Sequence, residues 1–124
     1  MLLTDQAIEE GKARQKKVKA HHEHHDCVRI AYEWLDAQKK IKGFTTKGYA
    51  IKHLVERWAG RYVSQSDVEL AAALHPDIRG SYPYFNISAR LTEPSSRRLD
   101  GIAQAFTQDQ NNRHDSKGYS VHEA

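Results

Sequence analysis

Three stretches of the chain carry apolar residues at the spacing of a helix with one buried face. The members of the first stripe are Cys27, Ile30, Ala31, Trp34, Leu35 and Ile41. Upstream of Cys27 the same face is polar, so the stripe fades there. We therefore predict one long N-terminal helix, ended by Gly43, in which residues 1–26 form a polar projecting segment and the rest packs.

The next two helices are predicted from a similar stripe and from local stop signals. The second stripe consists of Ile51, Leu54, Val55 and Trp58. Thr45 or Thr46 is placed to cap this helix. A third helix is predicted in "SQSDVELAAALHP", where Ser64 and Asp67 have the spacing of a capping box and Pro76 forces a stop.

The C-terminal half has weaker patterns. In "YFNISARL", residues 84–91, apolar residues alternate as in a strand, yet Ile87 and Leu91 also lie four apart, as on a helix. We favour a short helix there, and another along the apolar positions from Leu99 to Phe106. Residues 108–124 have little to bury, which predicts a disordered tail. The expected fold is mainly α: a compact bundle of four to five helices in residues 27–107, with a short β wing as an option.

Composition limits the class of protein. The chain has 124 residues, enough for one domain with its own core. Its single cysteine, Cys27, has no intrachain partner for a disulfide. No apolar run has the length of about 20 residues that spans a bilayer, and the N-terminus lacks a signal-peptide core. We therefore expect a cytoplasmic protein without membrane association.

The charge distribution favours a polyanionic partner. The net formal charge is +3, but the stretch from Lys39 to Arg98 holds eleven basic and five acidic residues. Lysine and arginine side chains that neutralise phosphates release condensed counterions, which drives binding to nucleic acid. This distribution predicts a basic face in the middle of the chain.

In its order of elements, "VSQSDVELAAAL" followed by "NISARL" resembles the helix-turn-helix and winged-helix superfamily. The linking segment "HPDIRGSYPY" is longer than the usual turn of three or four residues. The resemblance implies a small regulator of transcription or an accessory protein that binds double-stranded DNA. Residues 84–91 would then be the reading helix, with Asn86, Ser88 and Arg90 facing the bases.

Other residues are expected to support such binding. Arg79, Tyr82 and Tyr84 lie in a Gly- and Pro-containing loop, where they suit phosphate contact and base stacking, or a contact with a protein. Alternatively, both tyrosines pack over the core. The remaining predicted contacts with nucleic acid are Lys47, Lys52, Arg97 and Arg98, the last two as a phosphate clamp at a helix start.

The histidine-rich stretch "AHHEHHDC" suggests a metal site. On a helix, His21 and His25 lie one turn apart, as do His22 and Asp26, which is a spacing that grips one metal ion. Zinc would need further ligands from elsewhere, so three interpretations stay open: a solvated polar helix, a zinc site, or a pH-sensitive surface. No other cofactor is expected.

No catalytic residue can be assigned, because the chain has no Gly-rich phosphate loop, no G-x-S-x-G motif and no paired carboxylates. An enzyme is therefore not expected. The alternative to DNA binding is a protein-interaction module or inhibitor anchored by Trp34, Trp58, Tyr82 and Tyr84. The N-terminal helix would recruit a protein partner or form a homodimer. The third alternative is a metal-binding protein or metal-dependent hydrolase.

Overall fold

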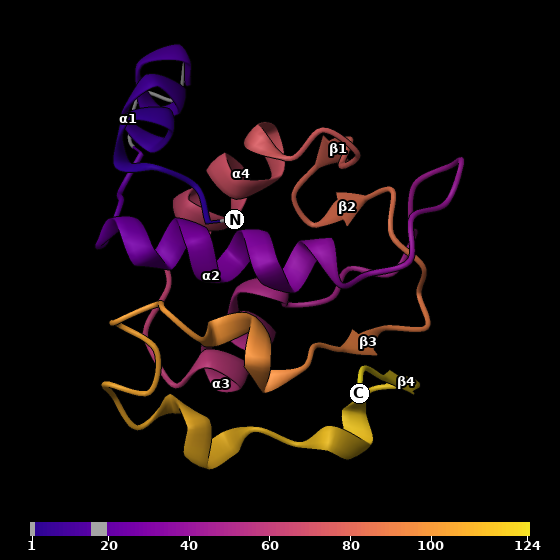
Figure 1. The fold of residues 1–124 in the computed structure, drawn as a ribbon. Coiled ribbons are helices and arrows are strands. Elements are labelled where there is room, and N and C mark those ends of the chain that lie inside the picture. The colour runs from indigo at the N-terminus through magenta and orange to yellow at the C-terminus, as the bar shows by residue number, and fades with distance from the viewer. Residues whose placement is uncertain (1, 16–19) are drawn as a thin grey trace.

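The computed structural model describes residues 2–15 and 20–124. Its α-helices are α1 (Asp5–Arg14), α2 (His25–Asp36), α3 (Ile51–Ala59) and α4 (Gln65–Leu74). Helix α2 lies in the middle, with α4 and α1 on one side and α3 on the other (Figure 1). The predicted mainly α class is confirmed. None of the described helices combines the length and apolar character needed to cross a bilayer.

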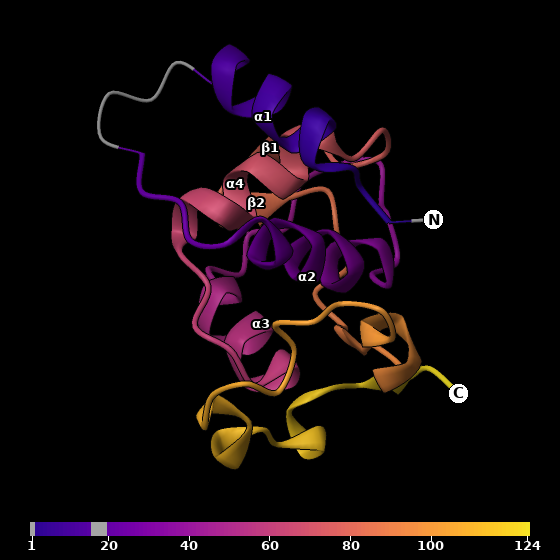
Figure 2. The same cartoon turned by 60° about the vertical axis from the view of Figure 1, so that its left-hand side comes forward.

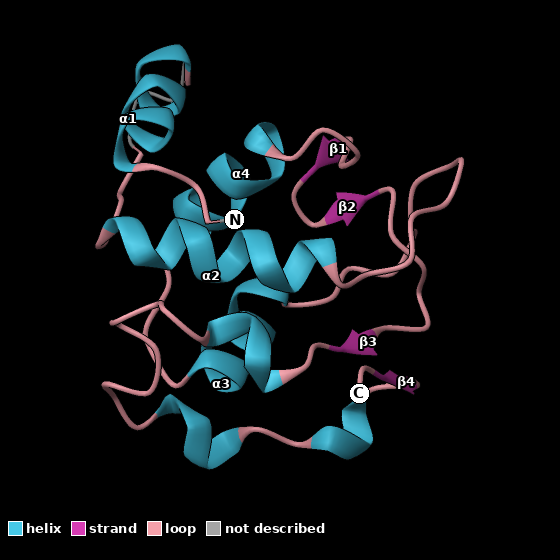
Figure 3. Cartoon of the chain, in the orientation of Figure 1, coloured by secondary structure: helices cyan, strands magenta, loops and turns pink. Residues whose placement is uncertain are grey.

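The strands are two residues long and form two separate pairs (Figure 3). Strand β1 (Gly80–Ser81) pairs antiparallel with β2 (Tyr84–Phe85) in a tight hairpin after α4. Strand β3 (Thr92–Glu93) pairs in parallel with β4 (Val121–His122) near the C-terminus. Three 3-10 helices, η1 (Ser96–Leu99), η2 (Gln110–Arg113) and η3 (Ser116–Gly118), lie along the C-terminal segment.

The core forms where the apolar stripes of the helices meet. From Cys27 to Leu35 the predicted stripe is fully buried, whereas Ile41 is only half-buried because α2 has already ended. Helix α4 begins at the predicted capping box: the Ser64 side chain accepts from the Asp67 amide, and the Asp67 carboxylate accepts from the Ser64 amide. Burial of these stripes supplies the main driving force for folding.

The prediction of one long projecting N-terminal helix is wrong. Thr4 caps a separate helix, α1, which packs beside α4 (Figure 2). Ile8 and Gly11 are buried in this contact, and a Cβ at Gly11 would lie 3.0 Å from a methyl carbon of Leu70. A new helix begins after His24, whose side chain accepts from the Asp26 amide and so provides the N-cap of α2.

Residues 84–91 are not helical, so the predicted reading helix is absent from this stretch. After β2, Ile87 forms an isolated antiparallel bridge with Lys40, and the Ser88 amide donates to the Lys39 carbonyl at 2.8 Å. The strand interpretation of the alternating pattern holds for Tyr84–Phe85 and for the bridge at Ile87, while residues 86, 89 and 90 form bends. The predicted helix from Leu99 to Phe106 is also absent: Leu99 is the last residue of the 3-10 helix η1, and residues 100, 101 and 103–106 form turns.

Residues 108–124 fold back onto the molecule instead of forming a disordered tail (Figure 1). The Tyr119 hydroxyl accepts from the Trp34 indole N–H at 3.1 Å, and both side chains are buried. Glu123 binds the Arg98 guanidinium through both carboxylate oxygens. Polar contacts with distant residues hold this segment in place. This explains why its low apolar content did not indicate that it is folded.

Candidate nucleic-acid interface

Two segments far apart in the sequence lie side by side at one corner of the molecule, the corner that carries β1 and β2 in Figure 1. They are residues 37–50, which follow α2, and residues 77–90, which contain the β1–β2 hairpin. The Ile41 amide donates to the Asn86 carbonyl at 3.0 Å, and the Thr45 amide donates to the Phe85 carbonyl at 3.0 Å. Backbone hydrogen bonds thus join the two segments into one continuous surface.

Asn86 holds the hairpin segment in shape from the inside. Its side chain is buried, accepts from the Arg79 amide at 2.6 Å and donates to the Asp77 carbonyl at 2.9 Å. A side chain whose amide oxygen and nitrogen are both used internally has no free edge for a base. Asn86 was predicted to contact adenine, but its position gives it a structural role.

The aromatic side chains of these segments divide into inward and outward ones. Tyr82 packs down: it lies edge-on to Phe85, with ring centroids 6.1 Å apart, and its hydroxyl accepts from the Lys52 amide. Tyr84 and Phe44 instead expose 49% and 51% of their surface. Tyr82 therefore packs over the core, as one of the two interpretations expected, while Tyr84 is exposed and its predicted contacts stay a prediction.

The positively charged Arg79 side chain lies next to one of the two exposed aromatic rings, that of Phe44. Its guanidinium carbon lies 5.6 Å from the centroid of the Phe44 ring, and Nη2 donates to the Lys42 carbonyl at 3.2 Å. This distance lies within the range of a cation–π contact. The guanidinium is thereby held beside an exposed ring without a carboxylate neutralising it among the described residues.

The two segments concentrate positive charge. They hold six basic residues and one acidic residue, Asp77, while the whole chain has a net formal charge of only +3. The rest of the chain is therefore net negative. We call the exposed basic and aromatic residues of this corner the basic aromatic surface; they are Lys39, Lys42, Phe44, Lys47, Arg79, Tyr84 and Arg90.

A shallow hollow lies within this corner. It has a volume of about 470 Å³, and Lys40, Lys42, Arg79 and Asp77 contribute to its walls. Burial lowers the pKa of Lys40, which donates to the Leu35 and Asp36 carbonyls, so this lysine is held in place by the end of α2. Lys42 and Arg79 are the exposed cations at its rim.

Three of the basic residues predicted to bind nucleic acid lie outside this surface. Lys52 is paired with Glu56, and its ammonium lies 4.2 Å from the centroid of the Tyr62 ring. Arg98 bonds to Glu123 as well as to Glu33 and Asp36 on α2.

These bonds raise the pKa of the Arg98 guanidinium, although burial acts in the opposite direction. The hydrogen bonds with Glu123 make the largest contribution. Arg98 is thus engaged in structure, and the predicted phosphate clamp of Arg97 and Arg98 is reduced to Arg97, which is exposed. Ser88 is half-buried, and its hydroxyl accepts from the Arg90 amide at 3.1 Å.

The predicted metal ligands point to separate partners. His22 contacts the buried Asp67 carboxylate at 3.0 Å, while His25 contacts Asp5 at 3.0 Å and Glu9 at 2.6 Å. His21 contacts Glu23 at 2.5 Å. Asp26 binds Arg29 and accepts from the Gln104 amide. Within residues 2–15 and 20–124, no three histidine, cysteine or acidic side chains are arranged around a common metal position.

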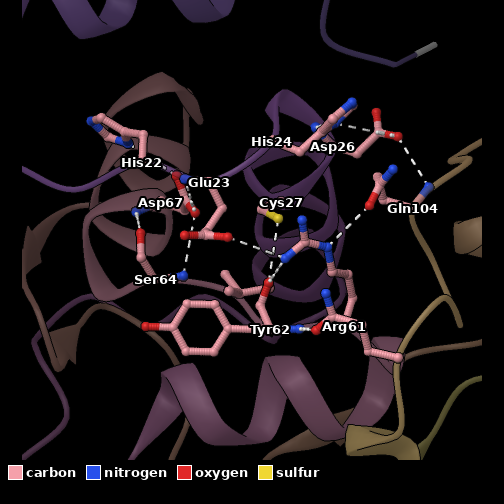
Figure 4. A network of polar contacts seen from close by, with 12 residues as sticks. His22, Glu23, His24, Asp26, Cys27, Arg61, Tyr62, Ser64, Asp67 and Gln104 are labelled. Carbon is pink, nitrogen blue, oxygen red and sulfur yellow. Dashed lines mark hydrogen bonds and ion pairs between the residues drawn. The ribbon is translucent and has the colours of Figure 1, made fainter.

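Figure 4 shows the network that uses part of this stretch. Asp67 accepts from the amides of Glu23 and Ser64, both at 3.2 Å, and its carboxylate is fully buried. The Cys27 thiol donates to the Tyr62 carbonyl, and burial raises the pKa of this thiol to about 12. These groups attach the segment before α2 to the start of α4, and Cys27 is not a thiolate nucleophile at neutral pH.

The sequence prediction missed Phe44, Lys42 and Lys39. A compositional signal was present: "KKIKGFTTKGY", residues 39–49, holds four lysines, two aromatic residues and no acidic residue. The local pattern of this stretch indicates a helix end and a cap, and it does not indicate which of its side chains are exposed.

Comparisons with protein-family models, with curated proteins and with solved structures find no match for this chain. The candidate interface therefore depends on the residues and contacts described above.

Proposed function

We propose that this protein binds nucleic acid through the basic aromatic surface. The observation that carries the proposal is the gathering of six basic residues, with a single acidic one, on two adjoining segments that also expose Phe44 and Tyr84. Positive charge beside exposed rings suits a partner that offers both phosphates and flat bases.

The state of the cations supports the proposal. Three cations of this surface have no carboxylate of the described residues within ion-pair distance; they are Lys42, Lys47 and Arg90. Unpaired cations that share a corner of the surface raise the local concentration of an approaching polyanion. Cations already paired with carboxylates, such as Arg98, contribute less.

The DNA-binding regulatory or accessory role predicted from the sequence is retained within this proposal, in a changed form. Without a helix at residues 84–91, the hairpin β1–β2 and the loop beside it would make the contact. This hairpin follows α4. A short β wing was one option in the predicted fold, with no position assigned to it.

The test is binding of fluorescently labelled oligonucleotides, single-stranded and duplex, followed by anisotropy at two salt concentrations. Lys42→Ala combined with Lys47→Ala and Arg90→Ala should weaken binding at least about tenfold and flatten the salt dependence. A matched control, Arg14→Ala with Arg113→Ala and Lys117→Ala, removes the same charge from exposed positions elsewhere. Equal losses in both variants, or no binding by the wild type at low salt, would contradict the proposal.

A protein-binding function is the second candidate, because half-exposed Phe44 and Tyr84 beside Arg79 are residue types enriched at interaction hot spots. Trp34 and Trp58, also predicted as anchors, are buried and drop out. Capture of a protein partner that survives nuclease treatment and is lost in Tyr84→Ala would favour this candidate.

A further inference from the structure

Phe44 and Tyr84 differ from the other aromatic side chains around them by being uncovered. On the same two segments Phe85 is 2% exposed, and Tyr49 and Tyr82 are half-buried, whereas Phe44 and Tyr84 keep about half of their surface exposed. Both sit against glycines of the same corner: a Cβ at Gly80 would lie 2.9 Å from Phe44, and one at Gly48 would lie 3.5 Å from the Tyr84 hydroxyl. The absence of a side chain at Gly80 therefore lets Phe44 lie close to the backbone of the hairpin, whereas a Cβ at Gly48 would make only an ordinary van der Waals contact with Tyr84. Both aromatic side chains keep about half of their surface exposed.

Arg79 extends this arrangement. Its guanidinium lies near the Phe44 ring and is tethered by its bond to the Lys42 carbonyl. Guanidinium planes and aromatic rings are the two kinds of side chain on which unpaired bases stack. The Arg79–Phe44 pair next to Gly80 and the Tyr84 side chain next to Gly48 offer two candidate stacking positions among cations.

The same corner lacks an element suited to a duplex. Sequence in double-stranded DNA is read by an α-helix or a longer β-ribbon that enters the major groove. Here the strands of the hairpin are two residues long, and residues 86–91 form bends and an isolated bridge. In a duplex the bases are already stacked on each other, so the exposed rings would find no partner.

On the basis of the proposed function, we infer that the basic aromatic surface takes single-stranded nucleic acid, with bases stacked on Phe44 and Tyr84 and phosphates beside Lys42, Arg79 and Lys47. The shallow hollow at Lys42 and Arg79 provides room beside the Arg79–Phe44 pair for part of the sugar-phosphate backbone. Stacking is tolerant of sequence because every base has a flat face. The expected preference is therefore for strand state more than for sequence.

The experiment measures binding of a labelled thymidine oligonucleotide of about 15 nucleotides, alone and annealed to its complement, at one low salt concentration. The single strand should bind at least about tenfold more tightly than the duplex. Phe44→Ala and Tyr84→Ala should each weaken single-strand binding about tenfold, with little change for the duplex. The control is Phe106→Ala, since Phe106 is equally exposed at 54% but lies on another segment.

Two results would overturn the inference. If strand and duplex bind equally, or if both aromatic variants bind the single strand like the wild type, the stacking role fails while nucleic-acid binding itself stands. If neither oligonucleotide binds, the proposed function falls as well. Thermal unfolding of each variant shows that a loss of binding does not come from loss of the fold.

Discussion

The ring of Phe44 lies against Gly80, at the start of the β1–β2 hairpin. A Cβ at Gly80 would come 2.9 Å from Phe44 Cδ1 and 2.5 Å from the Tyr84 carbonyl oxygen. Gly80 also has a φ of +104°, a conformation that side chains of L residues rarely adopt. The position of Phe44 on the candidate interface thus depends on the absence of a side chain at Gly80, which lies on the other of the two segments.

Gly80→Ala should therefore disturb the hairpin and the aromatic ring together. We expect a loss of about 1–3 kcal/mol in the free energy of unfolding and a clear loss of nucleic-acid binding. The control is Gly43→Ala in the neighbouring loop, where an added Cβ has nothing within 4 Å. Chemical denaturation and oligonucleotide binding measure the two effects, and equal behaviour of both variants would refute this role of Gly80.

Asn86→Ala tests the structural role of Asn86. The change leaves the Arg79 amide and the Asp77 carbonyl without their side-chain partner. We expect a loss of about 1–3 kcal/mol in stability, measured by urea unfolding. If the variant is as stable as the wild type but loses binding to particular DNA sequences, Asn86 reads bases after all.

Tyr119→Phe tests whether the C-terminal segment is packed. Without the hydroxyl, the buried Trp34 indole N–H loses its acceptor, which should lower the free energy of unfolding by about 1–2 kcal/mol. Tyr84→Phe removes a hydroxyl from an exposed side chain and serves as the control, with no expected change. An unchanged melting temperature for Tyr119→Phe would indicate that residues 108–124 are not held as described.

Acid should weaken the same segment through Glu93. Burial alone would raise the pKa of Glu93, but its hydrogen bonds with Ser116, His122 and His114 outweigh burial and lower the pKa to about 2. Because this pKa is below the ordinary value of 4.5, the stabilisation is complete above about pH 4.5. It is then lost as the pH falls towards 2.

The expected loss is about 1–2 kcal/mol, since the Glu93 side chain keeps 19% of its surface exposed and solvent screens part of the interaction. Urea unfolding at a series of pH values measures this dependence, and Glu93→Gln should flatten it over that range. The Glu10→Gln variant, at an exposed position on α1, gives the matched loss of one carboxylate. Parallel pH curves for wild type and Glu93→Gln would count against the assignment.

The helices that could be predicted are those with local signals. The stripe from Cys27 to Leu35 and the capping box of Ser64 and Asp67 depend only on residues a few positions apart, and both are present. Backbone pairing between distant residues accompanies the early end of α2 and the non-helical course of residues 84–91. An example is the hydrogen bond from the Ser88 amide to the Lys39 carbonyl. Periodicity contains no information on such pairing.

The candidate site was predictable in composition but not in arrangement. Arg79, Tyr84, Arg90 and Lys47 were assigned to nucleic-acid binding and lie on the two joined segments. Their meeting depends on hydrogen bonds between residues about 40 positions apart, such as that from the Tyr49 hydroxyl to the Ala89 carbonyl. Arg98 could not be separated from them by sequence, because its partners Glu33 and Asp36 on α2 lie 65 and 62 positions away and Glu123 lies 25 positions away.

The most direct test of the basic aromatic surface is an NMR titration of ¹⁵N-labelled protein with a single-stranded oligonucleotide. We predict that the resonances of backbone amides in residues 39–49 and 79–90 shift, while those of α1 and η3 do not change. Shifts confined to another region would contradict it, for example at the hollow of about 480 Å³ beside Arg57 and Arg113. A spectrum that does not change at low salt would contradict it completely.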